Sequence, residues 1–220
     1  MTQIFFREIK RLKALLLQQG EIIEEQVKQA SVALLSGDKA AATQVMHRDD
    51  AIDQREIDLQ EECFKLLALH QPVAVDLRFL VAVLKFNNDL ERIADLAANI
   101  AKRTVGLADL GEINLVFDFE EMSLVAQQML HQALLALIDI DPEATASVFN
   151  LEKGLNRLHK QNSNAIQQAM GRHPEDAEAL IHQLVISRNL ERIGDLATNL
   201  AEEVIYVARG EIVRHSNAPL

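Results

Sequence analysis

The sequence is poor in the residues that build disulfides, sheets and turns. Its 220 residues include one cysteine, no tryptophan, four prolines and eight glycines, and aromatic residues make up 4%. A single cysteine excludes a disulfide framework and any cysteine-based zinc or iron–sulfur site. The scarcity of aromatic residues argues against a sheet-rich fold, because strands favour aromatic and β-branched side chains.

Positive charge is also in short supply. The chain has 22 Lys+Arg against 33 Asp+Glu, a formal net charge of −11 at pH 7. An acidic chain without basic blocks is poorly suited to nucleic acid, because phosphate contacts require clustered Lys and Arg. The longest stretch without charge, residues 122–138, is too short and polar to span a bilayer, and charges from Arg7 onward leave no apolar signal core. These features predict a cytoplasmic protein without nucleic-acid partners.

The residues that are abundant favour helices. Leucine, alanine, glutamate and glutamine dominate, and the few glycines and prolines divide the chain into six segments of roughly 30 residues. Within the segments apolar residues recur at intervals of three, four and seven, which predicts one buried stripe per helix. We therefore expect an all-α protein with six long antiparallel helices. The second would run unbroken to Gln71, with Cys63 in its core, and the fifth would have Pro142 at its first position.

The third and sixth segments contain the same motif. Residues 89–101 read DLERIADLAANIA and residues 189–201 read NLERIGDLATNLA, with nine of thirteen positions identical at an offset of 100. Self-similarity at a fixed offset indicates a repeated structural unit. The unit is then a three-helix bundle, and we expect two in tandem, over residues 1–110 and 111–220. Gly194, inside the second motif, would let a neighbouring helix approach closely.

Each copy of the motif carries two carboxylates and an amide, one helical turn apart. They are Glu91, Asp95 and Asn99 in the first copy and Glu191, Asp195 and Asn199 in the second. The carboxylates of the first copy share a helix face with Leu77 and Leu84, which predicts that they are at least partly buried. Buried anions are costly without a counter-charge, so this pattern indicates either arginine partners or a metal ion.

The preceding helix of each bundle offers further oxygen ligands. Asp49 and Asp53 lie one turn apart in the second segment, and Glu152 and Asn156 occupy the matching place in the fifth, at an offset of 103. Hard cations bind several carboxylate oxygens at once, so two facing acidic stripes predict a metal site in each bundle. The alternatives are a solvated acidic face and pairing with arginines of the same chain or of a partner.

Five stretches of the sequence resemble the PhoU family of phosphate-signalling proteins. They are RDDAID (48–53), QPVAVDLR (71–78), ERIADLAANIA (91–101), ERIGDLATNLAEEVIY (191–206) and ARGEIVRH (208–215). The resemblance implies two tandem three-helix bundles, each with a carboxylate-bound multinuclear metal site that holds iron or another cation such as Mn, Mg or Zn. Because Asn156 stands where the family motif has aspartate, the second site should bind metal more weakly.

The resemblance also assigns the ligands residue by residue. The metal ligands it implies are Asp49, Asp53, Glu91, Asp95, Glu152, Glu191 and Asp195, with Asn99, Asn156 and Asn199 as secondary ligands.

The function implied by the resemblance is regulation. Family members link the ATPase subunit of the phosphate ABC transporter to a sensor histidine kinase and keep phosphate-starvation genes silent when phosphate is plentiful. The chain would then be a cytoplasmic, homodimeric negative regulator that reaches the membrane only through its partners. Two alternatives stay open, a metal-free helical adaptor and a transporter accessory protein without kinase signalling. Surface apolar patches and residues 1–6 are the candidate partner contacts.

Catalysis is not expected from this sequence. A carboxylate-bridged di-iron oxidase uses Glu-x-x-His pairs, and none of the seven histidines has a glutamate three residues before it. The chain also contains neither an HExxH motif nor a GxxxxGK(S/T) nucleotide loop.

Overall fold

The computed structural model describes residues 3–111 and 115–211, apart from the side chains of residues 49 and 50. The described residues form helices only, so the expected all-α class is confirmed for them. The elements are α1 (Gln3–Ser36), α2 (Lys39–Met46), α3 (Asp49–His70), α4 (Ala74–Asp109), α5 (Phe119–Asp139), α6 (Ala146–Arg172), the short 3-10 helix η1 (Pro174–Asp176) and α7 (Ala177–Arg209). None of these helices carries an uncharged apolar stretch long enough to cross a bilayer.

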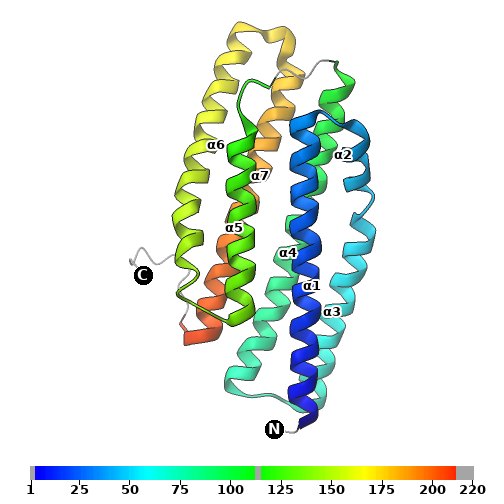
Figure 1. The fold of residues 1–220 in the computed structure, drawn as a ribbon, viewed down its shortest axis with the longest axis vertical. Coiled ribbons are helices and arrows are strands. Elements are labelled where there is room, and N and C mark those ends of the chain that lie inside the picture. Colours follow the sequence, from blue (N-terminus) through cyan, green and yellow to red (C-terminus); the bar gives the residue numbers. More distant parts are fainter. Residues whose placement is uncertain (1–2, 112–114, 212–220) are drawn as a thin grey trace.

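Two three-helix units lie side by side (Figure 1). In the first, α1, α3 and α4 pack together and α2 covers α1 and α4, and in the second, α5, α6 and α7 pack together. The units join where α4 runs antiparallel along α7 and where α1 lies along α5. These four helices therefore form the centre of the molecule, with α3 and α6 at its two edges.

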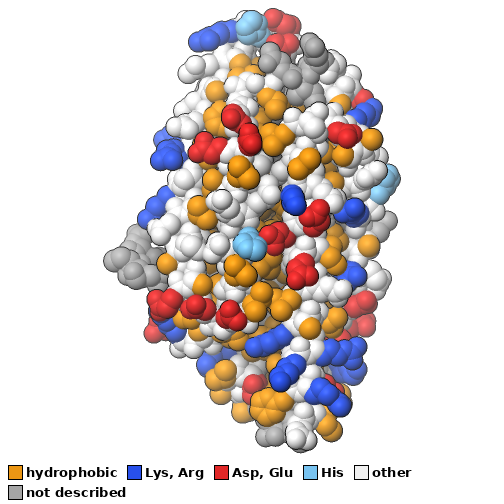
Figure 2. Space-filling model, viewed as in Figure 1, with side chains coloured by type: hydrophobic (Ala, Val, Ile, Leu, Met, Phe, Trp, Pro, Cys, Tyr) orange, Lys and Arg blue, Asp and Glu red, His pale blue; other side chains and the backbone are white. Residues whose placement is uncertain are grey.

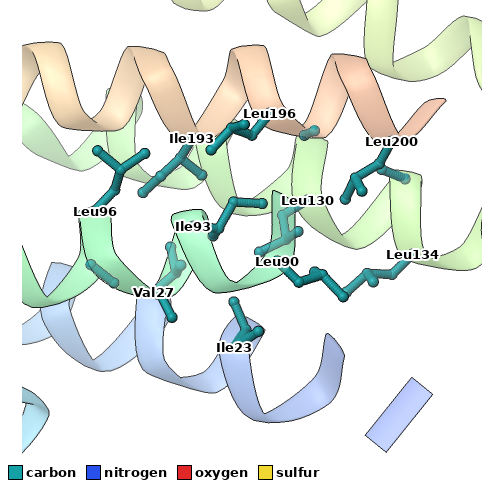
Figure 3. Packing of buried hydrophobic residues seen from close by; sticks show 14 of the residues in the cluster. Ile23, Val27, Leu90, Ile93, Leu96, Leu130, Leu134, Ile193, Leu196 and Leu200 are labelled. Atoms are coloured by element: carbon teal, nitrogen blue, oxygen red, sulfur yellow. The ribbon is translucent and has the colours of Figure 1, made fainter. Parts of the chain in front are cut away.

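A single apolar core passes through both units. Side chains from the four central helices meet in it (Figure 3). Those labelled there include Ile23, Val27, Leu90, Ile93, Leu130, Leu134, Ile193, Leu196 and Leu200. Because burying apolar surface contributes about 25 cal/mol per Å², a core common to both units holds them in one arrangement.

An ion pair with a buried carboxylate crosses the same junction. Lys85 of α4 donates to both carboxylate oxygens of Glu203 on α7 at 2.9 Å, and Glu203 is only 3% exposed. The ammonium group also lies 5.4 Å from the centre of the Tyr206 ring. A buried carboxylate is costly unless it is paired, so this contact fixes how α4 and α7 lie against each other.

Glycine at position 194 has the role expected from the sequence. A Cβ atom there would lie 2.2 Å from Cδ2 of Leu155 on α6. The absence of a side chain therefore lets α6 and α7 approach closely, which confirms the prediction. The core role of Cys63 is also confirmed, because its side chain is fully buried and burial, with the charge of Glu62, raises the pKa of the thiol to about 12.

Two expected helix boundaries were wrong. The second segment is two helices, because α2 ends at Met46 and α3 begins at Asp49, at a break that contains neither glycine nor proline. Asp38 caps α2 by accepting from the backbone N–H groups of residues 40 and 41 at 2.9 Å. Pro142 precedes α6 by four residues and lies in a turn, where its carbonyl accepts from the Thr145 hydroxyl at 2.6 Å.

Candidate functional site

The two copies of the repeated motif lie in the middle of α4 and α7. In each, the apolar letters of the motif are buried, as for Ile93 and Leu96 in α4 and Ile193 and Leu196 in α7. The carboxylates that both copies share are less buried: the glutamates at 91 and 191 are half-buried and the aspartates at 95 and 195 are exposed, whereas Asp89, at the start of the first copy, is buried. The core thus fixes each helix, and the carboxylates are held at its rim.

The expectation that the carboxylates continue a buried stripe was therefore only partly right. Leu77, on the same face of α4, is 41% exposed, and Leu84 is half-buried. Four helices, α1, α2, α3 and α7, pack around α4 and cover most of its circumference. Apolar residues therefore occur on several faces of α4, and sharing a face with leucines does not place a residue in the core. Asp95 lies on what remains open, so its carboxylate is near water.

The first carboxylate cluster, Asp53, Glu91 and Asp95, lies where α3 meets α4. Ile52 and Leu59 anchor α3 there, each 2% exposed. Burial raises the pKa of the Asp95 carboxyl, and the negative charge of Asp53 raises it further. Asp49 is the first residue of α3, and its side chain lies outside the described residues.

A hydrogen bond joins the two helices beside this cluster. The side-chain amide of Asn87, on α4, donates to the backbone carbonyl of Glu56 at 2.8 Å and to its carboxylate at 3.3 Å. Asn87 lies one turn before Glu91 and is 1% exposed. The bond fixes α3 against α4 at the level of the carboxylates.

The second carboxylate cluster, Glu152, Glu191 and Asp195, lies where α6 meets α7. Burial is the main cause that raises the pKa of each of the three carboxyl groups. The charge of Asp195 raises the pKa of Glu152 and of Glu191, and that of Glu202 raises the pKa of Glu152 further. Mutual repulsion in a partly desolvated site is the electrostatic condition that a bound cation relieves.

An imidazole that the sequence interpretation missed belongs to the second cluster. The charge of His159, on α6, lowers the pKa of both Glu191 and Asp195, and its Nδ1 lies 2.9 Å from the Ser187 hydroxyl oxygen of α7. Arg192 also lowers both values, after His159 for Glu191 and before it for Asp195. Part of the repulsion in this cluster is thus offset by the chain's own cationic groups.

The missed imidazole follows the same repeat as the expected ligands. The offset of 103 that relates Asp49 to Glu152 also relates Glu56 to His159, and the offset of 100 relates Asn87 to Ser187. In the first unit Glu56 of α3 contacts Asn87 of α4, one turn before Glu91. In the second, His159 of α6 contacts Ser187 of α7, one turn before Glu191. Extending the α3–α6 alignment by one turn would have identified His159 from the sequence.

The expected amide ligands lie next to the clusters. Asn99 and Asn156 are exposed and Asn199 is half-buried. Each lies one helical turn after a carboxylate of its cluster, namely Asp95, Glu152 and Asp195 respectively. The ligand atoms of the expected sites do not converge fully. Among the described side chains, the one triad of acidic or histidine groups with ligand atoms within 4.8 Å of one another is His173, Glu175 and Asp176, which is exposed and lies elsewhere. Three of the described carboxylate or imidazole groups could bind one cation at either cluster only after side-chain rotation.

Comparison with known proteins places both repeats in one sequence family. The PhoU domain matches the chain twice, over residues 16–104 and 119–204. A similar protein is the phosphate-specific transport system accessory protein PhoU homolog of Pseudomonas aeruginosa, 36% identical over 98% of this chain and 89% of that one. The homolog from Aquifex aeolicus is 30% identical over 96% of each chain.

Solved structures agree with these matches. The crystal structure of PhoU from Pseudomonas aeruginosa superimposes with a TM-score of 0.91 at 35% identity, covering 94% of this chain and all of that one. That of the phosphate transport system regulatory protein PhoU from Streptococcus pneumoniae gives 0.82 at 26% identity, over 95% and 99% of the two chains. With its duplicated motif, its paired helical units and these full-length similarities, the chain belongs to the PhoU family.

Proposed function

We propose that this protein is an accessory and regulatory component of a phosphate transport system. The observation that carries the proposal is the match to the PhoU domain in both halves of the chain. Relatives aligned over nearly its whole length are named phosphate-specific transport system accessory proteins. The duplicated motif lies in both matched regions.

The regulatory role that we propose is that of an adaptor. The protein would bind the ATPase subunit of a phosphate ABC transporter and a sensor histidine kinase, and would repress phosphate-starvation genes when phosphate is plentiful. It would act in the cytoplasm as a homodimer and catalyse no reaction. Long helices with wide lateral faces suit this task, because they present extended surfaces to partners.

Metal binding at the two carboxylate clusters is the finer part of the proposal. Ligand chemistry supports it, since the clusters offer carboxylate oxygens whose pKa values are raised by burial and by each other. The side chains that would hold the ions are Asp49, Asp53, Glu91 and Asp95 in the first unit and Glu152, Glu191 and Asp195 in the second, with Asn99, Asn156 and Asn199 beside them. A bound cation would supply positive charge that joins α3 to α4 and α6 to α7.

The adaptor role is tested by co-purification and by deletion. We expect the tagged protein to retain the transporter ATPase and the kinase from cells grown in high phosphate, and to retain less of one of them from starved cells. Deletion should release phosphate-starvation genes from repression in high phosphate. Retention of the ATPase alone, with normal repression in the deletion strain, would favour a transporter accessory protein without kinase signalling.

The metal role is tested with the double variant Asp95→Asn and Asp195→Asn. Protein purified without chelators should contain metal by elemental analysis, and the double variant should contain little. Because the carboxyl groups repel in the metal-free state, the variant should also be more stable than metal-free wild type. Glu61→Gln and Asp139→Asn, at exposed acidic positions outside the clusters, are the matched controls. Metal-free wild-type protein that is fully folded and still binds its partners would support the metal-free adaptor.

A further inference from the structure

One end of the molecule is built from two segments that are far apart in the sequence. The first turns of α1 and the turn between α3 and α4 meet at the lower end in Figure 1, and the lower ends of α5, α6 and α7 lie above them. We call this end the tip and define it as residues 4–11 and 69–77. Because the second unit does not reach it, the tip protrudes from the molecule.

The tip has a small excess of positive charge, whereas the chain as a whole is acidic. Arg7, Lys10 and Arg11 are exposed on α1, and the tip carries these three basic residues against two acidic ones, Glu8 and Asp76, in a chain of net charge −11. Glu8 lies 2.7 Å from Nε2 of His70. Lys and Arg side chains gather at the lower end of α1 in Figure 2, with hydrophobic side chains beside them.

Large apolar side chains are exposed on the same tip. Ile4 and Phe6 of α1 are 53% and 55% exposed. Leu69, Val73 and Val75, around the α3–α4 turn, are 65%, 66% and 56% exposed. Exposed apolar groups that lie together among polar residues mark an interaction surface, whereas single ones do not.

These side chains are held in place by the fold. Phe5, between the two exposed apolar residues of α1, is 1% exposed, and its ring centre lies 5.2 Å from that of His70 at the end of α3. Together with the Glu8–His70 contact, this packing fixes α1 on α3. The turn itself holds Gln71 and Ala74 at φ values of 44° and 49°, a left-handed backbone conformation that is strained for residues other than glycine. The ordering cost of binding is thus already met in the free protein.

We propose that the tip docks the protein directly onto an anionic lipid bilayer. The apolar side chains enter the interface, and Arg7, Lys10 and Arg11 lie against the lipid phosphates, a combination typical of peripheral membrane contacts. The acidic remainder of the chain is repelled by the same surface, so the long axis stands away from the membrane. This contact goes beyond the proposed function, in which partners alone bring the protein to the membrane.

A lipid surface fits the tip better than an acidic protein does. The tip protrudes, and its exposed basic residues lie on the same helix as two of its exposed apolar groups, Ile4 and Phe6, as suits a flat and fluid partner. Two cavities lie at the opposite end of the molecule, one of about 370 Å³ between the end of α1 and the end of α4 and one of about 390 Å³ where α4, α6 and α7 meet. A partner segment that needs a groove would find one there.

The experiment measures co-sedimentation of the full chain with vesicles. We expect binding to phosphatidylcholine vesicles that contain about one third phosphatidylglycerol, little binding to phosphatidylcholine alone, and release at high salt. The triple variant Arg7→Gln, Lys10→Gln and Arg11→Gln should bind about a hundredfold more weakly, because each basic residue near an anionic surface contributes about fivefold. Phe6→Ser with Val73→Ser should weaken binding about tenfold or more.

The controls are Lys102→Gln and Lys160→Gln, exposed basic residues of α4 and α6 outside the tip. They should bind like wild type, and circular dichroism melting should show that all variants stay folded. No binding to anionic vesicles, equal binding to neutral ones, or an equal loss in the controls would overturn the proposal. Vesicle binding that is absent, together with loss of a co-purified protein in the triple variant, would instead identify the tip as a protein contact.

Discussion

The two carboxylate clusters have the same framework and different chemistry. Both lie at the rim of a three-helix unit, between an outer helix and a central one, and both have a half-buried glutamate followed by an exposed aspartate. The first is flanked by the Asn87–Glu56 hydrogen bond, and the second by the His159–Ser187 contact. Most of the apolar residues that position the site and the glutamate–aspartate pair itself are thus the same in both copies, while the polar residues beside the pair differ.

The difference also changes how charge is balanced. In the second cluster the cationic groups of Lys153, Arg188, Arg192 and His159 each lower the pKa of at least one carboxyl group. In the first, the charge of Asp53 adds to the effect of burial on Asp95. An all-oxygen site favours hard cations, whereas an imidazole extends the range to zinc and other transition metals. If both clusters bind metal, they should therefore differ in the cation they prefer.

The largest effect is expected at the helix contact beneath the second cluster. Gly194→Val should lower the free energy of unfolding by about 2–3 kcal/mol, because the new side chain would overlap Leu155. In the first unit the equivalent residue is Ala94, which is buried and already carries a Cβ. Denaturant unfolding measures the change. Gly154→Ala, where a Cβ meets nothing within 4 Å, is the control and should add about 0.5–1 kcal/mol; equal destabilisation by both would contradict the packing account.

Exchanging one ligand between the clusters should come next. If both bind metal, Asp53→Asn should weaken cation binding in the first cluster by about tenfold or more, and Asn156→Asp should strengthen it in the second by a similar factor. Calorimetric titration of chelator-treated protein with Mn²⁺ would resolve the two affinities. Unchanged affinities in both variants would remove positions 53 and 156 from the ligand set.

Removing the imidazole should have a more selective effect. We expect His159→Gln to weaken Zn²⁺ binding by several-fold to about tenfold and to leave Mg²⁺ binding nearly unchanged, because imidazole is a good ligand for zinc and a poor one for magnesium. Competition between the two ions gives the ratio. The matched change in the first unit, Glu56→Gln, should not alter that ratio; a shift of equal size there would mean that the clusters do not differ in selectivity.

The smallest effect concerns pH in the metal-free protein. A carboxyl group whose pKa is raised by folding holds its proton more tightly in the folded chain, so stability falls as pH rises from about 4 through the raised values. Solvent screening limits each group to a few tenths of a kcal/mol, roughly. Asp195→Asn should reduce this fall more than Asp95→Asn does, since its charge also acts on Glu152 and Glu191. Denaturant midpoints measured between about pH 4.5 and 7.5, roughly the range where raised carboxyl groups titrate, would show the fall in stability. Stability that rises over this range would contradict the direction of the pKa shifts.

Much of the fold was predictable because helices are encoded locally. Leucine spacing and the few glycines and prolines gave the long helices and most of their ends, as at Gly37, Gln71 and Gly210. The break at residues 47–48 was missed because its turn has neither glycine nor proline, and the helix ends there only through backbone hydrogen bonds and packing. The misplaced Pro142 has a similar cause, since a proline that suits a first helical turn also suits the preceding turn.

The candidate site was predictable in its residues but not in its burial. The repeat identified both carboxylate pairs. That Glu91 and Asp95 share a helix face with Leu77 and Leu84 did not show how much of that face the neighbouring helices cover. His159 was missed because it matches a glutamate, and a comparison by residue identity passes over such a pair. Asp49 stays a prediction, because its side chain lies outside the described residues.

The sequence by itself determined the helical class, the duplication and the pairing of acidic residues one turn apart, since each depends on spacing along a single helix. Tertiary structure alone decided which faces stay open to water and that a basic and apolar tip forms from two segments that residues 12–68 separate in the sequence. The physical reason is that periodicity fixes directions within one helix, while exposure and electrostatic neighbourhood depend on the helices packed around it.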